Sequence, residues 1–167
     1  YDTDLLIKTL RDLRARYPHL EVILEPGSAH LWQTGDLRCT VLDVVENYGQ
    51  RTLMLDVSFT CHMPDTLEMP YRPQITGSSN EAKNEFSYAY RLGGMSCLAG
   101  DYLDNYFFVQ PVRVGDELVF EDMAHYTTVK TTMFNGVPHP DICIVDVHGE
   151  VTLRRTFGYG DYEARMG

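Results

Sequence analysis

The stretch Leu37-Arg38-Cys39-Thr40-Val41-Leu42-Asp43-Val44-Val45-Glu46 decides the fold, because the chain changes here from a helical pattern to a β pattern. The turn signal Asn47-Tyr48-Gly49 follows it, and a second apolar run extends from Thr52 to Phe59. Short apolar runs separated by residues of this kind are typical of successive strands. We therefore expect a β-domain to begin at Leu37.

Further short segments with the same pattern continue to the end of the chain, separated by turn signals such as Asn135-Gly136 and His148-Gly149. The predicted strands are Leu37 to Glu46, Thr52 to Phe59, Ser87 to Leu92, Glu117 to Glu121, Tyr126 to Met133, Ile142 to Val147 and Val151 to Phe157. Short strands at this spacing predict a mainly antiparallel β-sandwich or barrel-like domain over residues 37–167. The tail from Gly160 to Met166 is expected to form a short helix.

The residues before Leu37 have a different organisation. Apolar residues recur at spacings of three and four from Asp4 to Tyr17, which predicts an amphipathic helix that Pro18 ends. His19 to Leu24 follows as a predicted buried parallel strand, and Ala29 to Gly35 as a short helical segment. Residues 1–36 thus read as the end of an α/β unit, and the chain as a whole as α+β. One such repeat cannot bury its own sheet face, so we expect the rest of that unit to precede Tyr1.

Composition limits the classes of function. The chain has 167 residues, of which 44% are hydrophobic and 23% charged, enough for one sizeable core. A net charge of -10 argues against a nucleic-acid surface and favours cationic small molecules. No run of about 18 apolar residues or secretory signal is present, so no membrane contact and a cytoplasmic location are expected. The 4 cysteines lack the spacing of a zinc site, and no metal is predicted.

The loop Gly94-Met95-Ser96-Cys97-Leu98-Ala99-Gly100-Asp101 is the best candidate for chemistry. Glycine and small residues let a backbone approach a ligand closely, while Cys97 offers a nucleophile or acid and Asp101 a fixed negative charge. Glu25 stands where a predicted parallel strand ends, the usual place for an active-site acid. The plain alternatives are a buried cysteine and a surface acid at a turn.

Many segments together resemble the C-terminal portion of the carboxynorspermidine decarboxylase family, a branch of the pyridoxal-phosphate decarboxylases that include ornithine and diaminopimelate decarboxylases. The segments that carry the resemblance include Ile23-Leu24-Glu25-Pro26-Gly27, Cys61-His62-Met63-Pro64-Asp65, Leu67-Glu68-Met69-Pro70-Tyr71, Ser96-Cys97-Leu98-Ala99-Gly100-Asp101, Phe120-Glu121-Asp122-Met123-Ala124-His125-Tyr126-Thr127 and Phe134-Asn135-Gly136. The resemblance implies that residues 1–36 end a (β/α)8 barrel of the alanine-racemase kind. It also implies a homodimer with active sites shared between subunits.

The resemblance further implies roles toward pyridoxal 5'-phosphate. Glu25 would pair with the pyridinium nitrogen, while Gly27 and Tyr126 would contact the phosphate. Ser28 stands where related decarboxylases carry arginine, so phosphate binding should rely more on the backbone. The family's lysine that bonds the cofactor lies on an early barrel strand that this chain does not contain, and we expect a sample of these residues alone to release no carbon dioxide.

Substrate roles follow from the same resemblance. Cys97 would help protonate the carbanion after decarboxylation, and Asp101 would help hold the distal amine of the substrate. His62, Asp65, Glu68 and Phe134 would line the pocket of a polyamine precursor, although a structural histidine, surface-turn acids and a hairpin neighbour are the alternatives. The predicted reaction converts carboxynorspermidine or carboxyspermidine to norspermidine or spermidine. A decarboxylase of diaminopimelate or another basic amino acid, and a non-catalytic regulator, remain open.

Overall fold

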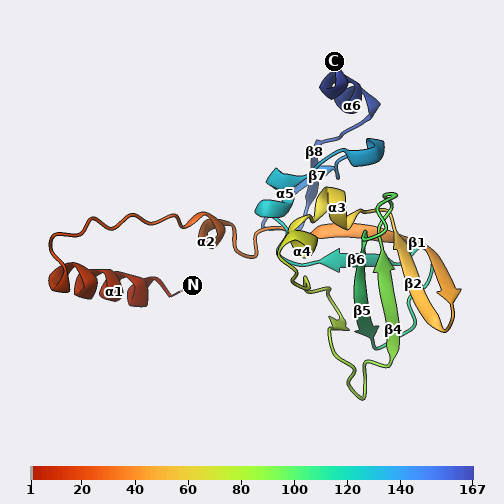
Figure 1. Cartoon of the computed structure of the whole chain (residues 1–167), viewed down its shortest axis with the longest axis horizontal. Coiled ribbons are helices and arrows are strands. Elements are labelled where there is room, and N and C mark those ends of the chain that lie inside the picture. The colour runs from red at the N-terminus through yellow and green to blue at the C-terminus, as the bar shows by residue number, and fades with distance from the viewer. Residues whose placement is uncertain (1) are drawn as a thin grey trace.

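A curved six-stranded sheet forms the body of the protein, with strand order β3-β5-β4-β2-β1-β6 (Figure 1). The computed structural model describes residues 2–167. The strands of this sheet are β1 (Leu37–Asn47), β2 (Gln50–Leu55), β3 (Ser78–Ser79), β4 (Tyr88–Gly93), β5 (Tyr102–Phe108) and β6 (Glu117–Phe120). Neighbouring strands are antiparallel except β2 and β4, which run parallel. The sheet is therefore mixed.

Strand β1 confirms the β pattern with which the domain begins. Its residues up to Thr40 pair with β6 and those from Val41 onward pair with β2, and the register of the β2 pairing shifts between Val41 and Asp43. Leu37, Cys39 and Val41 alternate into the core. A tight turn at Tyr48 and Gly49, with φ of 48° and 78°, leads into β2.

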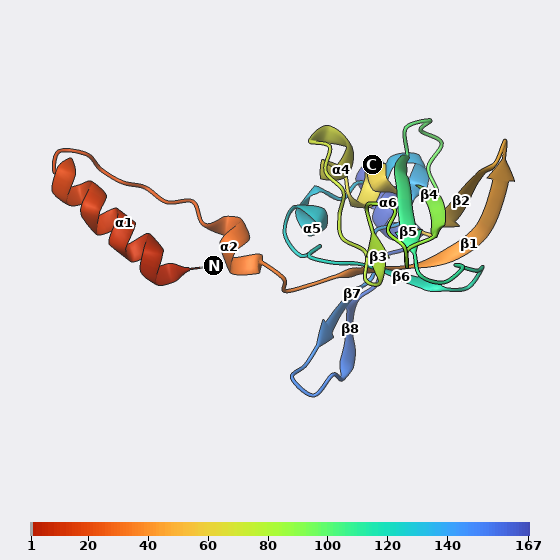
Figure 2. The same ribbon diagram turned by 90° about the horizontal axis from the view of Figure 1, so that it is seen from below.

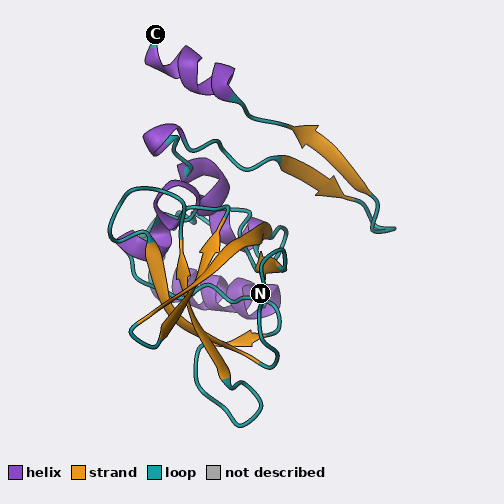
Figure 3. Ribbon diagram, turned by 90° about the vertical axis from the view of Figure 1, so that its right-hand side faces the viewer, coloured by secondary structure: helices purple, strands orange, loops and turns teal. Residues whose placement is uncertain are grey.

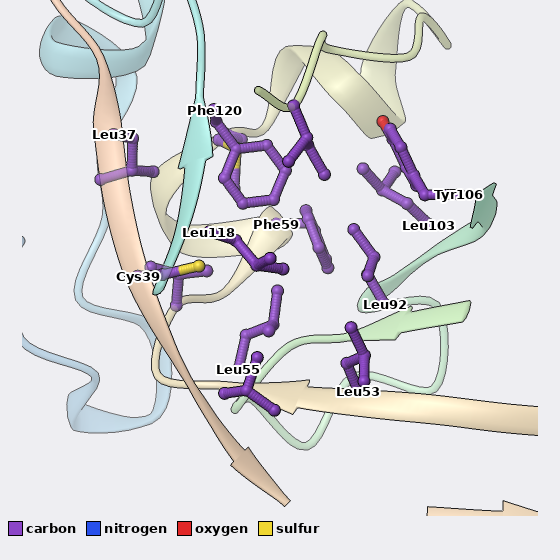
Figure 4. Close-up of a cluster of buried hydrophobic side chains, with 14 of the residues drawn as sticks. Leu37, Cys39, Leu53, Leu55, Phe59, Leu92, Leu103, Tyr106, Leu118 and Phe120 are labelled. Carbon is purple, nitrogen blue, oxygen red and sulfur yellow. The ribbon is translucent and has the colours of Figure 1, made fainter. Parts of the chain in front are cut away.

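The core consists of side chains from the strands of this sheet and from the helix that contains Phe59 (Figure 4). Leu53, Leu55 and Leu92 are fully buried, and the rings of Phe59 and Phe120 meet edge to face with centroids 6.1 Å apart. Burying a leucine or phenylalanine side chain contributes about 1.5–3 kcal/mol. Because Phe59 belongs to a short helix outside the sheet, this burial fixes that helix on the sheet.

Short helices gather at one end of the sheet (Figure 3). They are α3 (Phe59–His62), α4 (Asp65–Glu68), α5 (Tyr126–Lys130) and the 3-10 turn η1 (Phe134–Gly136). The strand predicted over residues 52–59 is confirmed only as far as Leu55, and the strand predicted over residues 126–133 is wrong. Strand β2 ends at Leu55, and α5 forms despite the β-branched residues Thr127, Thr128 and Val129, because tertiary contacts outweigh their weak intrinsic preference.

The C-terminal strands β7 (Ile142–Val145) and β8 (Val151–Arg155) form a separate hairpin that projects from the body (Figure 2). Every residue of the hairpin is exposed. The described residues therefore form one sheet, in which all neighbouring pairs but β2 and β4 are antiparallel, and a separate hairpin. The predicted α+β class and the mainly antiparallel pairing are confirmed. Of the two predicted architectures, a sandwich or a barrel-like domain, the sandwich of two packed sheets is not formed by these residues. Helix α6 (Tyr159–Met166) confirms the predicted tail helix.

The N-terminal residues extend away from the sheet (Figure 1). Helix α1 (Thr3–Arg16) confirms the predicted helix, and Asp2 caps it by accepting the Leu5 N–H at 2.9 Å. The predicted strand over residues 19–24 is not formed, and Ile23 is 77% exposed. Within residues 2–167 no other segment pairs with it, and a parallel strand depends on neighbouring strands for its hydrogen bonds. Helix α2 (Gly27–Leu31) begins earlier than predicted.

Candidate functional site

The cysteine loop connects the antiparallel neighbours β4 and β5. Its two ends, Gly94 and Asp101, are buried, whereas Cys97 is exposed. The Gly94 N–H donates to the Asp101 carbonyl at 2.7 Å, and the Met95 N–H donates to the Val57 carbonyl at 3.0 Å. The loop therefore presents the Cys97 thiol to solvent from an anchored base.

Asp101 provides that anchor. One carboxylate oxygen accepts the Thr60 N–H at 3.0 Å and the other accepts the Ser96 N–H at 3.0 Å. Burial by itself raises the pKa of Asp101, but hydrogen bonds from Ser96, Thr60 and Ser58 outweigh it, and the pKa lies below its ordinary value. The carboxylate thus fastens the cysteine loop to α3, and its contact with a substrate amine stays a prediction.

Helix α3 joins the segments that carry the predicted substrate residues. Thr60 binds Asp101 as described above. The Cys61 thiol lies 3.6 Å from the Phe134 carbonyl, and the Cys61 carbonyl accepts the Thr132 N–H at 2.9 Å. The His62 ring reaches the Pro138 carbonyl. Three successive residues of one helix thereby bring together the cysteine loop and the segment around Phe134, whose ring is 45% exposed.

His62 uses both ring nitrogens inside the chain. Nδ1 accepts the Ser58 N–H at 3.1 Å, and this assigns the ring proton to Nε2, which donates to the Pro138 carbonyl at 3.0 Å. Burial lowers the pKa of His62. A buried, neutral and fully bonded ring has the properties of a structural histidine, the alternative that the sequence left open. A contact with substrate stays a prediction.

Asp65 and Glu68 share one cation, a contact that was not predicted from the pattern of residues. The Lys130 ammonium forms an ion pair with Asp65 and lies 2.6 Å from Oε2 of Glu68. Hydrogen bonds to Asp65 and then to Glu68 raise the pKa of Lys130 to about 12. These two carboxylates can hold an ammonium group, and a substrate amine would have to share them with Lys130 or displace it. Lys130 was missed because its segment was predicted as a strand.

The predicted cofactor residues lie on two segments that hydrogen bonds connect. Glu25 and Gly27 lie at the start of α2, and Tyr126 begins α5. The Gln33 N–H, just after α2, donates to Oδ1 of Asp122 at 2.8 Å, close before α5. Figures 1 and 2 accordingly show α2 on the side of the sheet domain where α5 lies. Sequence reasoning gave Asp122 no role.

These residues fit the chemistry of pyridoxal phosphate. Glu25 is exposed and has the carboxylate that pairing with a pyridinium nitrogen would require. Tyr126, 53% exposed, supplies a phenol donor for a phosphate, and an added Cβ at Gly27 would meet nothing within 4 Å, so the backbone there is open to approach. Across residues 2–167, no cluster of His, Cys, Asp and Glu is arranged to hold a metal ion. No helix in the described part of the chain is long and apolar enough to cross a membrane.

In its sheet and in the segments around its cysteine loop, the chain agrees with the sheet domain of a cofactor-dependent decarboxylase. The chain matches the family described as pyridoxal-dependent decarboxylase, C-terminal sheet domain, over residues 4–124, and it belongs to this family. It is 55% identical over its full length to carboxyaminopropylagmatine decarboxylase of Synechocystis and 40% identical over 99% of its length to carboxynorspermidine/carboxyspermidine decarboxylase of Campylobacter jejuni. It spans 43% and 45% of those proteins.

A solved structure supports the same assignment. The crystal structure of carboxynorspermidine decarboxylase from Campylobacter jejuni, complexed with norspermidine, matches with a TM-score of 0.87 and 38% identity. The match covers 99% of this chain and 47% of that one. The predicted resemblance to this family is thereby confirmed.

Proposed function

We propose that the full-length protein is a pyridoxal-phosphate decarboxylase acting on carboxynorspermidine or carboxyspermidine. The observation that carries the proposal is the exposed Cys97 on a loop whose two ends are buried and hydrogen-bonded, in a chain with decarboxylase relatives along its whole length. The reaction breaks the bond between the α-carbon and its carboxylate. The electron pair stays on the α-carbon, a proton adds there, and carbon dioxide leaves.

We also propose how residues of this chain serve that reaction. Glu25 would hold the pyridinium nitrogen of the cofactor, and the Gly27 N–H and the Tyr126 hydroxyl would hold its phosphate. The chemistry that pyridoxal phosphate supplies when bound is an electron sink for the pair left on the α-carbon. Cys97 would donate the proton to that carbon, a general-acid step that is typically worth about 10²- to 10⁴-fold in rate.

The wider organisation belongs to the same proposal. Residues 1–36 would complete an α/β barrel that carries the cofactor, and residues 37–167 would form the sheet domain. Two subunits in the cytoplasm would share their active sites, each receiving Cys97 from its partner. The exposure of Cys97 on the β4–β5 connection supports this arrangement, because it leaves the thiol accessible to another subunit.

A second candidate substrate is carboxyaminopropylagmatine, which the 55% identical relative is named for. Its agmatine end carries a guanidinium group, whereas carboxynorspermidine ends in a primary ammonium. Asp65 and Glu68 already bind a primary ammonium, that of Lys130, and this contact supports the triamine substrate.

The test compares release of carbon dioxide by the full-length enzyme from four compounds. These are carboxynorspermidine, carboxyspermidine, carboxyaminopropylagmatine and diaminopimelate. We expect the highest kcat/KM with one of the two carboxylated triamines. A preference for carboxyaminopropylagmatine would select the second candidate, and a preference for diaminopimelate would refute both. Full-length protein that binds no pyridoxal phosphate would instead support a regulator.

A further inference from the structure

We propose that Asp122 is a positioning residue that sets the place of Tyr126 relative to the turn carrying Glu25 and Gly27, and so shapes the cofactor site. The inference rests on the proposed function, since it takes these three residues as cofactor contacts. They lie on two segments far apart in the sequence, one before β1 and one after β6. What holds these segments together therefore decides the geometry between the two ends of the bound cofactor.

Asp122 takes part in two hydrogen bonds between these segments, one through its side chain and one through its backbone. Its Oδ1 accepts the Gln33 N–H at 2.8 Å, and its own N–H donates to Oδ1 of Asp36 at 3.3 Å. The next residue, Met123, donates its N–H to the Gly35 carbonyl at 2.6 Å. The segment of residues 33–36 and the segment of residues 122–123 are thus joined by three hydrogen bonds. The bond to the carboxylate of Asp122 is the one nearest to α2 in the sequence.

The backbone at the crossing is held in an uncommon conformation. Gln33 has φ of 54° and Asp122 has φ of 59°, and neither is glycine. The left-handed region costs free energy for residues with a Cβ, and such residues persist where surrounding contacts hold them. Here the bond from Gln33 to Asp122 joins the two left-handed residues directly. Losing the carboxylate would remove the bond that joins these two residues.

The same carboxylate also faces the residue before Tyr126. Nε2 of His125 lies 3.7 Å from Oδ1 of Asp122, and the ring of His125 meets the ring of Tyr126 edge to face, with centroids 6.0 Å apart. Nδ1 of His125 is buried without a hydrogen-bond partner among the described residues. Asp122 is therefore in contact with the α2 side through Gln33 and close to Tyr126 through His125. At the other end of α5, Lys130 forms an ion pair with Asp65 of α4. This ion pair does not involve the segment that carries Glu25 and Gly27.

Three substitutions of Asp122 distinguish the effect of its carboxylate from the effect of its left-handed backbone conformation. Asp122→Asn keeps an acceptor oxygen and a residue that tolerates the left-handed region. Asp122→Ala removes the acceptor and keeps the strain, whereas Asp122→Gly removes both the acceptor and the strain. Glu46→Gln, which changes an exposed acid on β1, is the matched control.

The measurements are the dissociation constant of pyridoxal phosphate, from absorbance titration of the full-length apoenzyme, and the unfolding temperature of that apoenzyme. We expect Asp122→Asn and Glu46→Gln to bind the cofactor as the unsubstituted enzyme does. Asp122→Ala and Asp122→Gly should bind about tenfold more weakly, the loss expected for one hydrogen bond to a charged group. Asp122→Gly should unfold at a higher temperature than Asp122→Ala while binding no better, a separation that a purely structural role would not produce.

Two results would overturn the inference alone. One is an Asp122→Gly enzyme with the affinity of the unsubstituted enzyme, because the backbone and not the carboxylate would then matter. The other is an Asp122→Ala enzyme with the affinity of the unsubstituted enzyme, because the side chain of Asp122 would then not act on the cofactor site. If Asp122→Ala does not fold, the comparison of the Asn and Gly variants carries the test. An unsubstituted enzyme that binds no pyridoxal phosphate would overturn the proposed function, and this inference with it.

Discussion

Replacing Gly94 by alanine should release the base of the cysteine loop. A Cβ built at Gly94 would lie 2.5 Å from Cγ and 2.6 Å from Oδ1 of Asp101, closer than real Cβ contacts come. Both residues are buried, so the carboxylate has little room to move aside. Gly94 does not have a positive φ, so alanine can adopt the backbone conformation there. The expected effect of the substitution is therefore the clash with Asp101.

The magnitude follows from the bonds that Asp101 would lose. Its carboxylate accepts the N–H groups of Thr60 and Ser96, and hydrogen bonds to a charged group contribute about 1.5–3 kcal/mol each. Replacing glycine by alanine restricts the unfolded chain and returns about 0.4–1 kcal/mol. We therefore expect Gly94→Ala to lower the free energy of unfolding by about 2–6 kcal/mol.

Denaturant unfolding of the full-length protein measures the total effect, and hydrogen exchange at the Thr60 and Ser96 amides locates it. Gly100→Ala is the matched control in the same loop, since a Cβ there would meet nothing within 4 Å. It should change stability by less than about 0.5 kcal/mol. Equal stability and equal amide protection in the two variants would refute the reasoning that Gly94 is required by Asp101.

Three further predictions concern single side chains. Burial holds the pKa of His62 below its ordinary 6.5. The stability that the neutral ring contributes is therefore complete above pH 6.5 and decreases as the pH falls below that value, by up to about 1.4 kcal/mol per pH unit. Denaturant unfolding at pH 7.5 and 5.5 should show this loss, and a His62→Gln variant that loses as much stability between these pH values would contradict it. Lys130→Met should lower KM for carboxynorspermidine about two- to fivefold, the size of an exposed ion pair, with little change in kcat; an unchanged KM would place Asp65 and Glu68 away from the substrate. Burial, and then the charge of Asp56, raises the pKa of Cys39 to about 12, so iodoacetamide at pH 8 should label this thiol in urea but not in the native protein, and fast native labelling would show the burial to be wrong.

Local pattern predicted the parts of the fold in which burial alternates regularly. Leu37, Cys39 and Val41 alternate in the sequence as they do in the core, so β1 was predicted from them. Strand β5 was missed because Tyr90 pairs with Tyr106 and Leu92 with Leu103, which leaves an extra residue in β5. Leu103 and Tyr106 therefore both face the core, three positions apart, and the period of two is broken.

The candidate site was likewise predicted only where its residues are close together in the sequence. The cysteine loop was found from its own residues, because closely spaced glycines and a cysteine are visible locally. The contacts that fix the site join residues far apart in the chain, such as Thr60 with Asp101 and Asp122 with Gln33. No periodicity or short motif encodes such pairs, since they depend on how the sheet brings distant turns together. The contacts of Asp122 and Lys130 can therefore be seen only in the folded structure.

The anchoring of the cysteine loop also bears on how readily two subunits could associate. A flexible loop that becomes ordered on binding loses conformational entropy worth about 1–2 kcal/mol per residue. The bonds of Asp101 to Ser96 and Thr60 order the base of this loop already during folding of the single chain. If Cys97 enters a partner's site, most of this entropy is already lost before the subunits associate. More of the free energy of their contacts then contributes to affinity.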